Sequence, residues 1–213
     1  MVESKPWNWD VVSDERWNNP SEDVYYYVHR WKELGYRDLL DLGCGLGRNS
    51  ILFSQNGFNV YAFDLSQTAI AKLEENSEKL GLGIHTKLGD MLNLPYQDSS
   101  FDCILAYHVI SHTDTEGMKK IIREIGRVLR KNGEFYFTLC SKEGFRDPIK
   151  GQMIDANTVV KLEEPERGIP HFHADLEDIK DLFSGFKFEK IRHIQDIFEN
   201  MSSYHYFVLV KNV

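Results

Sequence analysis

Three glycines spaced two residues apart, Gly43, Gly45 and Gly47, form the part of this chain best suited to hold a polar ligand. They follow residues 39–42, an apolar run too short for a helix, and helical spacing resumes at Asn49. Glycine adopts positive φ at such a turn, and without a Cβ it lets a ligand approach backbone N–H groups closely. The helix that follows directs its positive end to the same place. The stretch therefore predicts a strand, a tight turn and a helix around a bound ligand.

A carboxylate stands at the end of the next predicted strand. Residues 58–64 read as a buried strand that ends in Asp64, 23 residues after Asp41. Nucleotide-binding βαβ units place their ribose-binding acid at an interval of about 20 residues. A carboxylate suits that task because it accepts two hydrogen bonds from a vicinal diol. Ser66 already suits the N-cap of the next helix, so we assign Asp64 to a ribose.

Two imidazoles follow the fourth predicted strand, residues 101–107, which ends in Tyr107. His108 and His112 stand at the carboxyl edge, where open parallel sheets bind their ligands. Imidazole titrates near neutrality, so both histidines are candidate catalytic bases. A role as a polar rim or capping residue is the alternative for each of them.

The elements that position these residues alternate between short apolar runs and helical periods. Helices are predicted over 67–80, 115–130 and 175–183, and further strands over 84–88, 134–140, 186–191 and 204–211. This order is typical of an α/β protein with a Rossmann-like, doubly wound sheet.

The glycine loop also carries a family resemblance. The run Asp41-Leu42-Gly43-Cys44-Gly45-Leu46-Gly47 resembles the first motif, (D/E)-x-G-x-G-x-G, of the class I S-adenosylmethionine-dependent methyltransferases. It departs from the dinucleotide fingerprint G-x-G-x-x-G because Arg48 replaces the third glycine. Residues 92–102 are similar to the family's connector into the fourth strand, and the resemblance spans about residues 39–210. It implies a three-layer αβα domain with a mostly parallel sheet and an antiparallel last strand.

The resemblance also implies a cofactor, S-adenosyl-L-methionine, and the residues that bind it. In this family the loop cradles the methionine end, and the acid before the glycines lies near the ammonium group; alternatively, this acid only orients the turn. An acid after the third strand accepts from the adenine amino group, and its apolar neighbour packs on the ring. The implied cofactor-binding residues are Asp41, Gly43, Cys44, Gly45, Asp64, Leu65, Asp90, Met91 and Tyr107.

The N-terminal segment, residues 1–36, is rich in aromatic residues, and a helix is predicted over 21–34. The helix either packs at the sheet edge or acts as a lid over the cofactor, with Tyr27 or Arg30 contributing side chains. We therefore expect an N-terminal aromatic-rich helical lid followed by a methyltransferase domain, residues 37–213, within one compact domain.

Residues 141–173 lose their periodicity between repeated glycines and prolines. Long irregular segments in compact domains are usually functional, so this one is assigned to substrate selection. His171 and His173 lie at its end, two residues apart. No third ligand stands at a recognisable spacing, so no metal site is expected.

Composition narrows the possible partners. A net charge of −8 argues against a nucleic-acid substrate, since tracking phosphates requires a basic surface. No apolar run is long enough for a membrane span, and three cysteines outline neither a disulfide frame nor a zinc ribbon. We expect a cytoplasmic monomer or homodimer with a small-molecule methyl acceptor as partner, and neither nucleic acid nor membrane.

These observations together predict in-line methyl transfer from the cofactor sulfonium to a nucleophile on a small molecule. A base is not obligatory, because the sulfonium is already an excellent leaving group and the enzyme mainly aligns the reactants. The continuation Gly47-Arg48-Asn49-Ser50 is similar to the tellurite-resistance and thiol branch. The alternatives are an S-adenosylmethionine-binding protein without catalysis and, disfavoured by Arg48 and Asp90, a nucleotide-cofactor oxidoreductase.

Overall fold

The described part of the chain contains five α-helices, most of which alternate with strands. The computed structural model describes residues 2–11, 15–145, 151–164, 166–197 and 202–213. The helices are α1 (Glu22–Glu33), α2 (Arg48–Gln55), α3 (Gln67–Leu80), α4 (Thr115–Val128) and α5 (Leu176–Leu182), with short 3-10 turns at Trp9–Val11, Glu15–Asn18 and Lys142–Phe145. None of the helices in this described part of the chain is long and apolar enough to cross a membrane.

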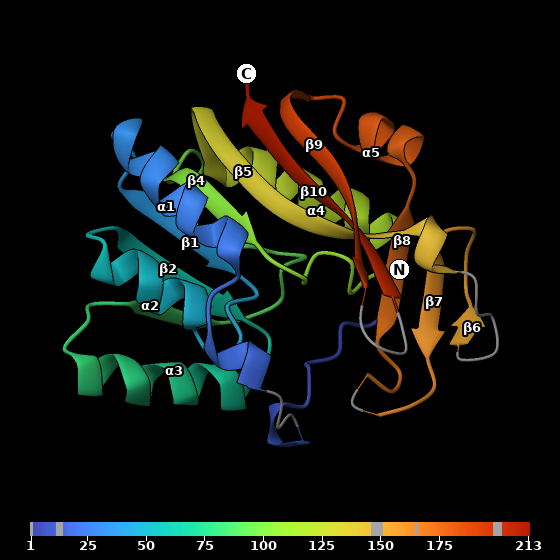
Figure 1. Cartoon of the computed structure of the whole chain (residues 1–213), viewed down its shortest axis with the longest axis horizontal. Coiled ribbons are helices and arrows are strands. Elements are labelled where there is room, and N and C mark those ends of the chain that lie inside the picture. Colours follow the sequence, from blue (N-terminus) through green and yellow to red (C-terminus); the bar gives the residue numbers. More distant parts are fainter. Residues whose placement is uncertain (1, 12–14, 146–150, 165, 198–201) are drawn as a thin grey trace.

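The strands build one twisted sheet with a small extension (Figure 1). They are β1 (Asp38–Leu42), β2 (Asn59–Asp64), β3 (His85–Leu88), β4 (Phe101–Ala106), β5 (Leu129–Ser141), β6 (Gly151–Met153), β7 (Thr158–Lys161), β8 (Pro170–Ala174), β9 (Phe186–Ile197) and β10 (Ser202–Asn212). The strands in the order β3-β2-β1-β4-β5 are parallel, and β10 lies antiparallel between β5 and β9. The predicted fold, with its antiparallel last strand, is confirmed.

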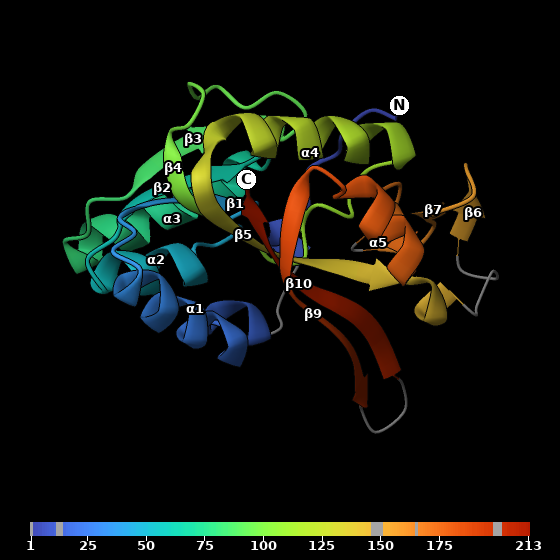
Figure 2. The same cartoon turned by 90° about the horizontal axis from the view of Figure 1, so that it is seen from above.

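Helices cover both faces of this sheet. Alternate residues of β5 face opposite layers, so Phe135 and Phe137 pack in one core with α4 and α5, while Tyr136 packs in the other with α1. Figure 2 shows α4 on one side of the sheet and α1 and α2 on the other. Because both faces are buried, the parallel strands read as continuous apolar runs in the sequence.

Helix α1 forms where it was predicted and is packed against the sheet. Tyr27 stacks on Tyr136 with ring centroids 3.8 Å apart. The buried carboxylate of Glu134 accepts hydrogen bonds from Arg30 Nε at 2.9 Å, Arg30 Nη2 at 2.6 Å and Trp31 Nε1 at 2.9 Å. Tyr27 and Arg30 therefore face the sheet, and neither of the two side chains lines the cavity described below.

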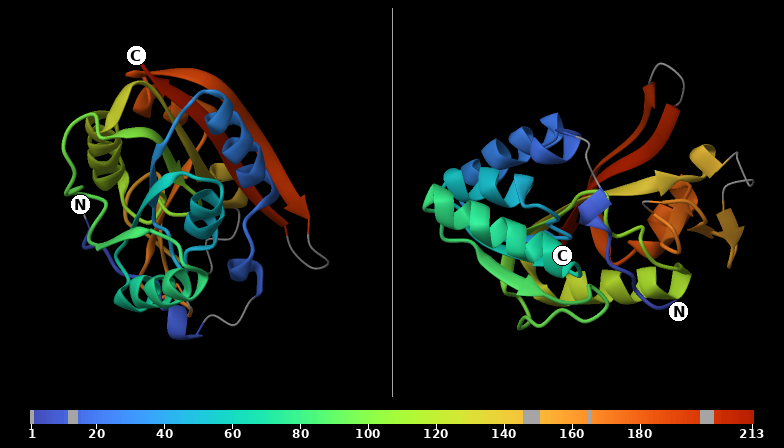
Figure 3. Two further views of the ribbon diagram at one scale, coloured as in Figure 1. Left: turned by 90° about the vertical axis from the view of Figure 1, so that its left-hand side faces the viewer. Right: turned by 90° about the horizontal axis from the view of Figure 1, so that it is seen from below.

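The prediction of an irregular segment over 141–173 is wrong for part of that segment. Strands β6, β7 and β8 pair in antiparallel order, and β8 joins β5 through the pairs Cys140–His173 and Ser141–Ala174. These strands have three to five residues, too few to show a period between the glycines and prolines. Strands β9 and β10 form a separate antiparallel pair, and Figure 3 shows it extending beyond the body of the domain.

Candidate active site

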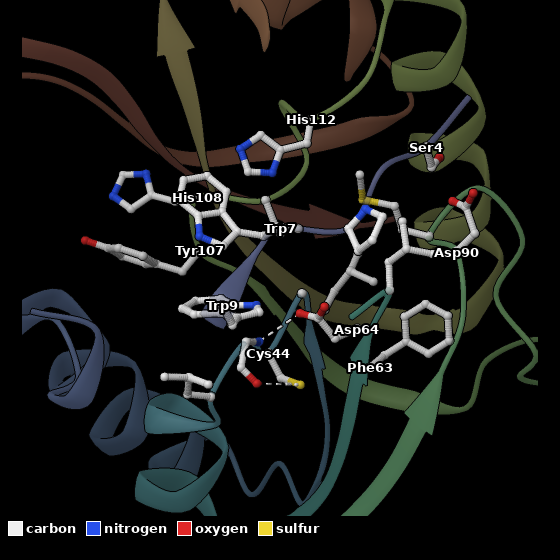
Figure 4. A pocket seen from close by; sticks show the side chains of 18 of the residues that line it. Ser4, Trp7, Trp9, Cys44, Phe63, Asp64, Asp90, Tyr107, His108 and His112 are labelled. Carbon is white, nitrogen blue, oxygen red and sulfur yellow. Dashed lines mark hydrogen bonds between the residues drawn. The ribbon is translucent and has the colours of Figure 1, made fainter. Parts of the chain in front are cut away.

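A cavity lies at the carboxyl ends of β1, β2 and β4 (Figure 4). About 900 Å³ of space, including some open to solvent, is free of protein atoms there. Five segments line it: residues 42–46, 63–65, 89–91 and 107–109, and the N-terminal residues 4–7. Trp9, Trp17, Arg48, Asn49 and His112 complete the lining.

The glycine loop has the geometry that the sequence required. The φ angles of Gly43, Gly45 and Gly47 are 69°, 53° and 87°, all in the left-handed region. A Cβ on Gly43 would lie 2.2 Å from a methyl carbon of Val109, and one on Gly45 would lie 2.6 Å from the Trp9 ring. Neither glycine therefore has room for a side chain, because Val109 and the Trp9 ring pack directly against the turn.

Asp64 ties the end of β2 to this loop. Its Oδ2 accepts from the Gly45 N–H at 2.8 Å and its Oδ1 from the Ser66 N–H at 2.8 Å. Burial raises the pKa of Asp64, although these two hydrogen bonds favour the charged form. Each carboxylate oxygen has a second lone pair, so the group still has acceptor capacity for a ligand.

The turn after β3 lies at the opposite end of the view in Figure 4 from Tyr107 and His108. Oδ1 of Asp90 accepts from the Leu92 N–H at 2.9 Å, and Met91 packs against the main core. Asp90, Met91 and Leu65 all line the cavity.

Asp41 is placed differently from the expectation. It is 1% exposed, does not line the cavity, and accepts a hydrogen bond from Ser50 Oγ at 2.5 Å. Burial raises the pKa of Asp41 to about 6. The carboxylate thus braces the glycine loop against α2, as the alternative interpretation of this residue proposed.

His108 and His112 both line the cavity, and their surroundings disfavour the charged imidazole. His108 has φ of 55°, and its backbone N–H donates to Thr138 Oγ1 at 2.7 Å. Burial and the nearby His205 hold the pKa of His108 well below its usual value. Burial, helped by His171, lowers the pKa of His112 to about 3. Each is therefore a weak proton acceptor, and their catalytic roles stay predictions.

Sequence reasoning missed part of the cavity wall. Trp7, Trp9 and Trp17 form a cluster with ring centroids 5.8–6.2 Å apart. The aromatic content of residues 1–36 was the available signal, but it was assigned to the helix rather than to the residues before it. Asn49, in the first turn of α2 and 5% exposed, carried no signal of its own.

Several polar atoms of this wall have no partner within the described protein. They are the indole Nε1 atoms of Trp7 and Trp9 and the Oδ1 atom of Asn49, all buried. Buried polar groups are normally hydrogen-bonded, so two unused donors and one unused acceptor indicate a polar ligand. Together with the glycine loop and the two acids, they fit a ligand with an amino acid, a sugar and a base. Among the described residues, no group of three His, Cys, Asp or Glu is placed to hold a metal.

The sheet order and the glycine loop after the first strand, with acids after the second and third, define a class: Rossmann-like proteins of the class I methyltransferase type. Comparison with known proteins agrees. Residues 40–137 match the family model described as a methyltransferase domain. The matched part of the chain is similar to the domains of the class I S-adenosylmethionine-dependent methyltransferases, a family whose methyl donor is that cofactor.

The curated relatives include one that is named for an activity on tRNA. The probable S-adenosyl-L-methionine-dependent methyltransferase TehB of Haemophilus influenzae (strain 10810) is 37% identical over 87 residues, 41% of this chain and 30% of that protein. The tRNA N(3)-cytidine methyltransferase METTL2 of Danio rerio is 29% identical over 191 residues, 84% of this chain and 51% of that protein. The chain thus spans about half or less of the length of these curated relatives.

A solved structure shares the fold over nearly the whole chain. A SAM-dependent methyltransferase from Methanosarcina mazei superposes with a TM-score of 0.73 at 19% identity, covering 92% of this chain and 99% of that one. At this identity the likeness concerns the fold alone.

Proposed function

We propose that this chain transfers a methyl group, in line, from S-adenosylmethionine to a nucleophile on a small molecule. One observation carries the proposal: a single cavity brings the glycine loop Gly43–Gly45 together with the carboxylates of Asp64 and Asp90. These groups come from three successive strand ends, and each suits a different part of the same ligand.

The residues predicted from the sequence take their roles here as part of the proposal. Backbone of Gly43, Cys44 and Gly45 receives the methionine end, with Asn49 as the buried acceptor within reach of this loop. Asp64 with Leu65 binds the ribose. The bound cofactor supplies a methyl group on a positively charged sulfur. The chain's own task is to orient the reactants and to exclude water.

The purine end has its own pair of residues in this proposal. Asp90 accepts from the adenine amino group, and Met91 packs on the ring. Tyr107, which lines the cavity at the end of β4, closes the cofactor site on the other side. Asp41 acts indirectly, because it holds the loop from behind through Ser50.

The covering element is the segment before α1 rather than α1 itself. Residues 4–7, with Trp9 and Trp17, line the cavity, and the Trp9 ring packs against Gly45 of the glycine loop. Figure 1 shows this N-terminal segment crossing the carboxyl ends of the strands. Its indole rings remove water from the reaction site and surround a sulfonium with the faces of aromatic rings, which attract cations.

Charge favours a small acceptor over a nucleic acid. The chain carries a net charge of −8. Among the residues lining the cavity, Lys5 and Arg48 are cationic and Asp64 and Asp90 are anionic, so the cavity itself offers no excess of positive charge. The relative METTL2 is named for a tRNA activity, which makes tRNA the alternative acceptor to test.

Two measurements test the proposal. Calorimetry with S-adenosylhomocysteine, and with NAD as the contrasting ligand, examines the cofactor. A methyl-release screen over thiols, amines, phenols, chalcogen oxyanions and unmodified tRNA examines the acceptor. Binding of S-adenosylhomocysteine and turnover with a small molecule are expected. Turnover with tRNA alone would overturn the proposal of a small-molecule acceptor. Binding of S-adenosylhomocysteine without any turnover would favour a protein that senses the cofactor.

A further inference from the structure

An ion pair between His171 and Glu166 lies beside His112, in the segment that precedes α5; the His171 side chain is buried and that of Glu166 is 29% exposed. His171, on β8, is 5% exposed. Its Nε2 lies 3.2 Å from Glu166 Oε1, and its Nδ1 lies 3.2 Å from the carbonyl oxygen of Ile169. Both oxygens are acceptors, so both contacts are satisfied only when each nitrogen carries a hydrogen. A ring protonated at both nitrogens and paired with the carboxylate fits this geometry.

The carboxylate of this pair is held in its charged form. Burial opposes ionisation, but the hydrogen bond from His171 and its charge lower the pKa of Glu166 to about 2. Lys161 Nζ, 3.8 Å from Glu166 Oε2, adds a weaker attraction. A partly buried carboxylate with two cationic neighbours remains ionised at neutral pH.

The pair lies directly behind His112, which lines the cavity. The His112 ring stacks on Trp7 at 5.7 Å and 25°, and meets the His171 ring at 4.8 Å and 66°. Figure 4 shows the rings of Trp7 and His112 side by side. The backbone fixes the same arrangement, because the Phe172 N–H donates to the Ser111 carbonyl at 2.7 Å. The ring of His112 is thus held from both sides.

We propose that Glu166 and His171 are positioning residues that keep the His112 ring uncharged and in one orientation beside the bound methyl acceptor. The inference rests on the proposed function. An uncharged imidazole offers one hydrogen-bond donor and one acceptor to the acceptor molecule. It also adds no positive charge next to a sulfonium, where a second cation would weaken cofactor binding. His112 thereby selects an acceptor with a polar group rather than removing its proton.

The charge on His171 and the apolar contact with Trp7 both favour the uncharged His112 ring. Burial, then the positive His171, lower the pKa of His112 to about 3, whereas Glu166 acts in the opposite direction. The other charged or titratable groups near the three residues are Lys161 on β7, His173 on β8, His205 on β10, Cys140 on β5 and His108 after β4. Their influence is included when each variant is compared with the wild-type chain.

The test is a pH titration of the histidine rings by NMR on the full chain, with the His112 signal assigned through His112→Gln. In the wild type the ring should stay neutral from pH 8 to pH 4. His171→Gln leaves the Glu166 carboxylate without its cation, so the midpoint of His112 should rise by about 1–3 pH units into that range. The double variant Glu166→Gln with His171→Gln removes both charges and should return the midpoint toward wild type. Glu163→Gln, an exposed carboxylate in the same connection, is the control and should change nothing.

An unchanged His112 midpoint in a folded His171→Gln chain would overturn the proposal. So would ring nitrogen shifts showing a single proton on His171 in the wild type at pH 7. Should His171→Gln fail to fold, Glu166→Gln serves instead, and there His171 must lose one of its two ring protons at pH 7. The titration needs no cofactor, so a failure of S-adenosylhomocysteine binding in calorimetry would refute the proposed function separately.

Discussion

Replacement of Asp64 by alanine removes the group that connects the end of β2, the glycine loop and the proposed ribose. The carboxylate accepts from the N–H groups of Gly45 and Ser66, both at 2.8 Å. Hydrogen bonds to a charged group contribute about 1.5–3 kcal/mol each. Loss of the ribose contact alone should therefore weaken binding of S-adenosylhomocysteine by about 10- to 150-fold.

Stability should respond less than affinity does. Burial raises the pKa of Asp64, so its charge is unfavourable in the free protein, and alanine relieves part of that cost. The unpaired N–H groups of Gly45 and Ser66 act in the opposite direction. Asp64→Asn keeps one oxygen but turns an N–H donor toward another donor, so its affinity should fall between those of Asp64→Ala and wild type.

The assay is isothermal calorimetry with S-adenosylhomocysteine, accompanied by circular dichroism and urea unfolding. Asp98→Ala is the matched control, since this acid lies in the loop before β4 and pairs with Arg127 outside the cavity. The control should bind like wild type. A folded Asp64→Ala chain whose affinity stays within twofold of wild type would refute the assignment of the ribose site.

Three further substitutions test other parts of the site. Gly45→Val should abolish S-adenosylhomocysteine binding in calorimetry while the circular dichroism spectrum persists, because a Cβ there would lie 2.6 Å from Trp9 in a turn with φ of 53°. His108→Ala should lower turnover without loosening the cofactor if the imidazole acts on the acceptor; looser cofactor binding in calorimetry would instead give it a binding role. Asp41→Asn should flatten the pH dependence of stability. Burial raises the pKa of Asp41 from 3.8 to about 6. The contribution of Asp41 to the free energy of unfolding is therefore fully present below pH 4 and is lost as the pH rises through 6. The loss is about 3 kcal/mol, measurable as the difference between wild-type and variant urea unfolding at pH 4 and pH 7.

Much of the fold was predictable because the strands are buried on both faces and the helices carry local end signals. Helix α3 begins at Gln67 and ends at Leu80 as predicted, with Ser66 accepting from the Ala69 N–H and Gly81 in the left-handed conformation. The short strands β6, β7 and β8 were not predictable, since pairing between distant segments rather than local periodicity determines them.

The cofactor end of the site was predictable for a similar reason. Its residues follow successive parallel strands, whose carboxyl ends meet at one edge of the sheet. The Trp7 and Trp9 rings reach the same cavity from a segment with no strand to fix its course. Only the fold brings that segment to Gly45.

Asp41 shows how strand geometry overrides a motif. Side chains of a strand alternate between faces, so Asp41 shares its face with Leu39, which packs in the core with α1 and α2. A side chain on that face points toward α2, and Ser50 is the polar group that it meets. The motif placed an acid before the glycines correctly, but the strand period already directed its carboxylate behind the loop rather than into the cavity.

The N-terminal segment links the two ends of the cavity. The Trp9 ring covers Gly45, while Trp7, two residues earlier, stacks on His112. The segment is also anchored at its start, where the Val2 N–H donates to Asp114 Oδ2 at 2.6 Å, at the N-cap of α4. A ligand that moves Trp9 away from the loop must therefore also move Trp7 or bend the chain between them. Occupation of the cofactor end and the packing of His112 at the acceptor end are consequently coupled through three residues of backbone.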